Sequence, residues 1–121
     1  MITSIADMPP GTIGFEATGE VTAADYENVL APALRAATEA GSVRMLYLLG
    51  DGFESYSAGA AVQDAKLWFG HLSGWERVAV VSDHAWIVNG VTAFAWMMPG
   101  ELRTFAPAEL ETAKAWVAGT G

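Results

Sequence analysis

The sequence predicts one α/β domain, residues 1–121, built on a mostly parallel five-stranded sheet in the order ββαβαβαβα. Runs such as 43–49 and 77–82 are almost continuously apolar, which is typical of strands covered on both faces. These runs alternate with segments of helical periodicity, as in sheets with helical crossovers. A chain of 121 residues without linkers or repeats is long enough for one such domain.

The first two strands are expected at 2–6 and 12–20. Apolar and polar residues alternate in the second segment, and a Pro-Pro-Gly turn at 9–11 separates the two. Because a tight turn joins them, the first strand should pair antiparallel with the second.

A helix is expected over 23–40. Thr22 precedes it with an acid at Asp25, a shortened form of the capping box, and Gly41 is placed to end it. Pro32 lies inside this segment, removes one backbone hydrogen bond and should bend the helix.

The rest of the chain is predicted to alternate between strands and helices. Strands are expected at 43–49, 77–82 and 101–105, and helices at 58–72, at 84–98 and from Pro107 onward. Asp83 is placed to cap the helix 84–98, and residues 50–57 are expected to form a loop.

Composition excludes several classes of partner. Six Lys and Arg against fourteen Asp and Glu give a net charge of −8, which disfavours nucleic acid and anionic membranes. The sequence has no cysteine, hence no disulfide and no thiolate chemistry. We expect a cytoplasmic protein without a transmembrane segment, because no signal peptide and no apolar run of about 20 residues is present.

No catalytic, cofactor or metal motif is complete. Around Ser57 the nucleophile pattern G-x-S-x-G fails, because Ser55 stands where a glycine is required. His71 and His84 do not have metal-ligand spacing. The polar rim expected after two strands, formed by Asp51, Glu54, Asp83 and His84, is interpreted as solvated loop. The sequence therefore predicts no enzyme, cofactor or metal.

Short segments between 13 and 116 occur in a distinctive order and spacing. They are Ile13-Gly14-Phe15-Glu16-Ala17, Gly19, Leu46-Tyr47-Leu48-Leu49, Asp64-Ala65-Lys66 with His71, 76–83 with Trp86, Glu101-Leu102-Arg103-Thr104-Phe105 and 111–116. In these segments the chain resembles the SpoIIAA-like group of small bacterial proteins, related in fold to STAS and CRAL-TRIO domains. The resemblance implies a β-α superhelix and a role in regulation or lipid-related binding.

The STAS resemblance also implies a phosphoacceptor serine at the start of helix 58–72. Ser57 or Ser55 would occupy that position, where a helix N-terminus can hold a phosphate. The nearby acids Asp51 and Glu54 oppose the added charge, and the alternative is that Ser57 is a helix N-cap.

Helix 84–98 is unusual because no charge occurs from Ala85 to Met98. Such a helix is either packed in the core or exposes an apolar patch. The candidate ligand or interface residues are Trp68, Phe69, Trp75, Trp86, Phe94, Trp96 and Met97. The sequence therefore predicts a non-enzymatic interaction module that forms homodimers through helices 58–72 and 84–98, or alternatively a carrier of a lipid-like apolar molecule.

Overall fold

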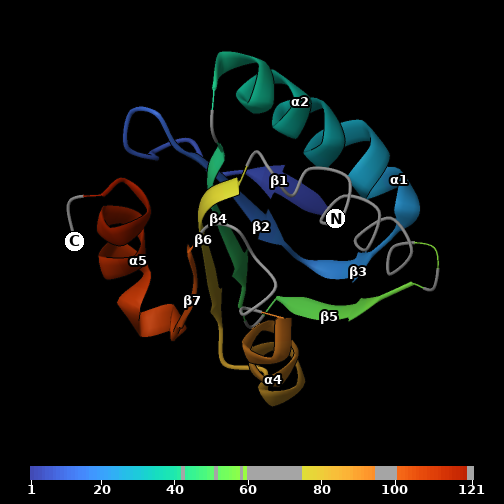
Figure 1. Cartoon of the computed structure of the whole chain (residues 1–121). Coiled ribbons are helices and arrows are strands. Elements are labelled where there is room, and N and C mark those ends of the chain that lie inside the picture. Colours follow the sequence, from blue (N-terminus) through green and yellow to red (C-terminus); the bar gives the residue numbers. More distant parts are fainter. Residues whose placement is uncertain (42, 51, 58, 60–74, 95–100, 120–121) are drawn as a thin grey trace.

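The computed structural model describes residues 1–41, 43–50, 52–57, 59, 75–94 and 101–119. Its central element is a five-stranded sheet in the order β1–β2–β4–β6–β7 (Figure 1). The strands are β1 (Ile2–Ser4), β2 (Ile13–Ala17), β4 (Val43–Leu49), β6 (Trp75–Ser82) and β7 (Glu101–Phe105). Only the β1–β2 pair is antiparallel. The predicted α/β fold, with its antiparallel first strand, is confirmed.

The apolar runs occupy the middle of this sheet. In β4, Val43, Met45, Tyr47 and Leu49 belong to one hydrophobic cluster, whereas Leu46 belongs to a second. Successive side chains of a strand point to opposite faces, so the two clusters lie on opposite faces of the sheet. The continuous apolar pattern arises because both faces are covered.

The helix predicted over 23–40 forms as a continuous run of α1 (Ala23–Asp25), the π-helical turn η1 (Tyr26–Leu30) and α2 (Ala31–Ala40). In the π-helical turn, the N–H of Ala31 donates to the carbonyl of Tyr26, five residues earlier. Pro32 is the next residue, lies in the first turn of α2 and has no N–H to donate. The departure from regular α-helical hydrogen bonding therefore lies directly before the proline. Gly41 ends the helix with φ of +140°, as expected for a glycine there.

The segment predicted as one strand over 12–20 divides into two. Gly19 has φ of +60°, and beyond β2 the chain forms β3 (Gly19–Val21) in a separate two-stranded sheet. Its parallel partner is β5 (Phe53–Tyr56), in the segment predicted as a loop. Glycine, Asp and Ser surround this four-residue strand in the sequence and conceal its alternation.

Helices lie on both sides of the large sheet (Figure 1). A 3₁₀ turn, η4 (Pro107–Glu109), leads into α5 (Leu110–Val117), which lies on the side opposite to α1 and α2. Ala113, Trp116 and Val117 of α5 are buried, and Leu110 is partly buried against the same cluster.

The third predicted helix is α4 (Ala85–Phe94). The His84 carbonyl accepts the first helical bonds, from the N–H groups of Ile87 and Val88 at 3.1 Å each, so His84 holds the N-cap position predicted for Asp83. Helix 58–72 lies outside the described residues except for Gly59, which is helical, and so do residues 95–98. Within the described part of the chain, no helix has the length and hydrophobicity needed to cross a bilayer.

The predicted capping box at Thr22 is present. The Asp25 carboxylate accepts hydrogen bonds from the Thr22 N–H at 2.9 Å and the Thr22 hydroxyl at 3.1 Å. Burial, the largest single influence, raises the pKa of Asp25, but the hydrogen bonds from Thr22 and the N-terminal ammonium group together outweigh it. The pKa of this carboxyl therefore lies below its ordinary value.

This lowered pKa makes the stability of the fold depend on pH. The folded state binds the Asp25 proton less readily than the unfolded state, so the stabilisation is present above about pH 4 and is lost as pH falls through the folded-state pKa. We expect the urea midpoint to fall below about pH 4 and to fall less in Asp25→Asn. Parallel midpoint curves for the two proteins would contradict this assignment.

Candidate functional site

The carboxyl ends of β4 and β6 form the edge at which open α/β sheets usually bind ligands. Gly50 follows β4, and His84 follows β6 by two residues. Nε2 of His84 lies 3.2 Å from the carbonyl oxygen of Gly50, which can only accept, so Nε2 carries the proton in this contact. The backbone N–H of His84 donates to the hydroxyl oxygen of buried Ser82 at 3.2 Å. These bonds fix the connection between β6 and α4.

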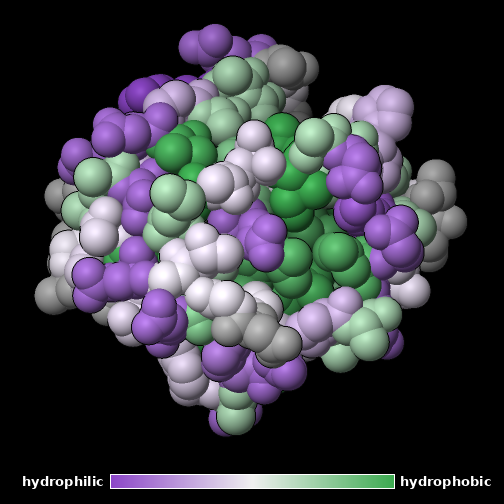
Figure 2. All heavy atoms as spheres, turned by 180° about the vertical axis from the view of Figure 1, so that it is seen from behind, coloured by the Kyte–Doolittle hydropathy of each residue, from purple (hydrophilic) through white to green (hydrophobic). Residues whose placement is uncertain are grey.

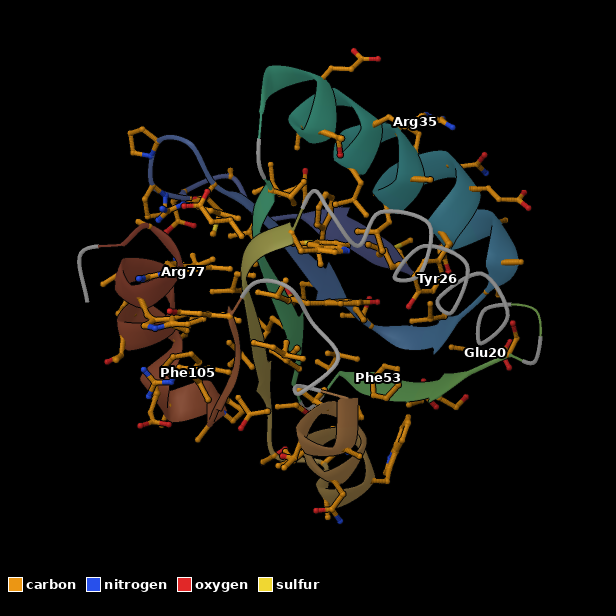
Figure 3. All side chains as sticks on the ribbon, viewed as in Figure 1. Glu20, Tyr26, Arg35, Phe53, Arg77 and Phe105 are labelled. Carbon is orange, nitrogen blue, oxygen red and sulfur yellow. The ribbon has the colours of Figure 1, made fainter. Side chains whose placement is uncertain are left out.

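Three rings meet at this edge and form what we call the Phe53 cluster: Phe53, His84 and Trp86. The Phe53 ring is 3% exposed and meets the His84 ring edge to face, with centroids 5.5 Å apart. Trp86 lies 5.9 Å from Phe53 at a tilt of 38°. Figure 3 shows Phe53 on β5 beside α4. The small second sheet therefore supplies the base on which the Trp86 ring rests.

Trp86 is the outermost ring of the cluster and is 56% exposed. On the same helix Ile87 is buried and Val91 is partly buried, whereas Asn89 and Ala93 are exposed. The uncharged helix thus packs one apolar side on the core and presents another side, including Trp86, to solvent. The structure thus places Ile87 in the core and Trp86 at the surface of the same helix.

The other predicted patch residues have different positions. Trp75 is 4% exposed and pairs with Val43 at the start of β6, so it belongs to the core and not to an exposed surface. The sequence predicted this strand only from Arg77 onward, because the polar residues Glu76 and Arg77 separate Trp75 from the apolar run, and so Trp75 was assigned to the preceding loop. Outside the described residues are Trp68, Phe69, Trp96, Met97 and the side chain of Phe94.

The predicted acidic rim is only partly described. Glu54 and Asp83 are exposed, and Asp51 lies outside the described residues. Within the described ranges, no three His, Asp or Glu side chains come close enough to share a metal ion.

The two candidate phosphoacceptors differ in setting. Ser55 is exposed in β5, in register with exposed Glu20 of β3, so a phosphate there would meet a neighbouring carboxylate on the same face. Ser57 is partly buried, and its N–H donates to the carbonyl of Val21 at 2.8 Å. The helix that Ser57 is predicted to cap lies outside the described residues.

A mostly parallel sheet with one antiparallel edge strand and helices on both sides defines a small α/β domain. The SpoIIAA-like family model matches residues 12–118. The chain belongs to the SpoIIAA-like family, which confirms the resemblance found in the sequence.

A solved structure shows the same fold. It is an uncharacterized protein of the DUF3478 family with a SpoIIAA-like fold from Shewanella loihica PV-4. It is 24% identical, with a TM-score of 0.78, and the alignment covers 96% of this chain and 93% of the other. No curated protein matches the chain.

Proposed function

We propose that the protein is a non-enzymatic interaction module of the STAS type that forms homodimers through the apolar helices predicted over 58–72 and 84–98. The observation that carries this proposal is the exposed ring of Trp86, supported from below by Phe53. Tryptophan is enriched among residues that dominate binding energy at protein interfaces. Exposed Ala93 on the same helix leaves room for close approach of a second copy.

The hydrogen bonds of the polar groups at the carboxyl ends of β4 and β6 disfavour catalysis by a nucleophile and a base at this edge of the sheet. His84 is engaged with the Gly50 carbonyl through Nε2, and the buried Ser82 hydroxyl accepts from the His84 backbone. In this arrangement the imidazole is not presented to the serine as a base. The geometry supports positioning of Trp86 better than a nucleophile and base pair.

Replacing Trp86 with Glu tests the dimer. The wild type is expected to be dimeric by light scattering at tens of micromolar, and Trp86→Glu should be a folded monomer, because a buried carboxylate at the interface would be unpaired. Ala108→Glu is the matched control: it adds the same charge at an exposed position in η4 and should leave the dimer intact. A monomeric wild type would refute the proposal.

The alternative function is binding or carrying a lipid-like apolar molecule. The observation that supports this alternative is a hollow in which hydrophobic residues gather, on the face seen from behind in Figure 2. Native mass spectrometry of protein purified from cells separates the two functions, since it reports both subunit number and retained ligand. A monomer carrying a lipid mass would support the alternative.

A further inference from the structure

The large sheet ends at β7, which is paired with β6 on one side and with no other strand of the described chain on its outer side. Glu101 and Arg103 of β7 are exposed, and Leu102 and Thr104 are partly buried. The outer side of an edge strand presents backbone N–H and C=O groups that can pair with a strand of another molecule. β7 is therefore an accessible template for strand pairing.

Two opposite charges lie on the side of β7 that faces α5. Arg77 of β6 is in register with Glu101, and its Nε lies 3.4 Å from the Glu101 carboxylate, which is 64% exposed. The guanidinium carbon of Arg103 lies 5.0 Å from the centroid of the Phe105 ring and 5.5 Å from that of Trp116. Figure 3 shows Arg77 and Phe105 on the α5 side of the sheet. The two rings thus hold a positive charge at the sheet edge, two residues from a negative one.

The order of these charges is self-complementary when two copies of β7 pair antiparallel. A two-fold axis perpendicular to the sheet then relates the copies, so residues equally far before and after the axis face each other. With the axis at Leu102, Glu101 of each copy faces Arg103 of the other. Charged edge residues ordinarily discourage pairing, and an axis at Arg103 would bring two like charges together. Charge therefore favours the register centred on Leu102.

We infer that a second copy of the chain binds at this edge by antiparallel pairing of β7 with β7, centred on Leu102. Each Arg103 then contacts the rings of its own chain and the Glu101 carboxylate of the second copy. Each Glu101 lies between Arg77 of its own chain and a guanidinium of the second copy. Such a network stabilises more than an isolated surface ion pair. Because a strand of five residues makes a small contact, we expect a dissociation constant of about 0.5 mM.

This contact is separate from the proposed dimer, which uses the helices predicted over 58–72 and 84–98. The Trp86→Glu variant, expected to be monomeric at tens of micromolar, isolates β7 pairing. In sedimentation velocity its mean mass should rise from monomer towards dimer between about 0.05 and 1 mM. The buffer contains about 0.15 M NaCl, so that the net charge of −8 is screened. If the wild type is itself monomeric at tens of micromolar, the proposed function fails and the same measurement on the wild type still tests β7 pairing.

Two charge reversals, made in the Trp86→Glu chain, test the register. Arg103→Glu leaves acids at both facing positions and Glu101→Arg leaves bases at both, so neither variant should associate with itself. An equal mixture of the two should associate at least as tightly as the parent, because every facing pair is then opposite in charge. Arg35→Glu, exposed on α2, makes the same change in net charge as Arg103→Glu and should leave the association unchanged.

Rescue in the mixture also shows that both reversed variants are folded. Should circular dichroism show either to be unfolded, Arg103→Gln is the milder variant, and it should weaken the association about fivefold. A parent that stays monomeric at 1 mM, about twice the expected dissociation constant, would overturn the inference. So would a mixture of folded variants that stays monomeric, or equal effects of the substitutions at Arg103 and Arg35.

Discussion

Replacing Trp116 with Ala is expected to lower the free energy of unfolding by about 4 kcal/mol. The ring is 6% exposed, packs against Phe105 with centroids 5.8 Å apart, and lies under the guanidinium groups of Arg77 at 5.1 Å and Arg103 at 5.5 Å. Its removal leaves a cavity between α5 and the sheet and also removes both cation–π contacts. Urea denaturation followed by circular dichroism measures the loss.

Trp86→Ala is the matched control, because it deletes the same side chain at a position that is 56% exposed. In dilute protein, where the proposed dimer is dissociated, it should cost about 1 kcal/mol or less, mainly from the lost contact with Phe53. Similar losses in the two variants would show that α5 does not secure this face of the sheet.

The arginines near Trp116 show what the sequence could not reveal. Nη1 of Arg77 donates to the carbonyl of Trp116 at 2.6 Å, and Nη1 of Arg44 donates to the carbonyl of Val117 at 3.3 Å, which satisfies carbonyls at the end of α5. In sequence, Arg44 appears only as an interruption of an apolar run. Its helix partner is 73 residues away, beyond any local pattern.

The fold itself was predictable because its signals are local. Continuous apolar runs marked β4 and β6, and a cap with a terminal glycine marked the helix from Thr22 to Gly41. β5 was not predictable from local sequence. It has only four residues, and its extended conformation is stabilised by pairing with β3, more than 30 residues earlier in the chain.

The candidate site was predicted only in part for the same reason. Absence of charge in α4 showed that the helix is unusual, but not which side faces the core. The packing of α4 on β6 and β7 decides which side is buried, and the Phe53 ring of β5 meets Trp86. The neighbouring positions of Glu16 and Leu48 on the sheet could not be predicted, because they arise only through the register of β2 with β4.

The second large effect is expected at Gly14, which makes room for the N-terminal segment 5–12. A Cβ at this position would lie 2.6 Å from Sδ and 2.8 Å from Cγ of Met8. Gly14→Ala should therefore displace Met8 and cost about 2 kcal/mol, although a Gly to Ala change in unstrained backbone ordinarily stabilises slightly. Urea denaturation gives the value.

Met8→Ala provides the test of cause, because it removes the atoms with which the new Cβ collides. The segment should otherwise stay in place, since Asp7 remains paired with Nζ of Lys114 at 3.0 Å. The single change should cost about 1 kcal/mol, as expected for a partly buried methionine. The double variant Gly14→Ala/Met8→Ala should then be no less stable than Met8→Ala, a coupling of about 2 kcal/mol. Additive losses would mean that Gly14 is required for some reason other than contact with Met8, and the packing of the N-terminal segment on β2 would have to be reconsidered.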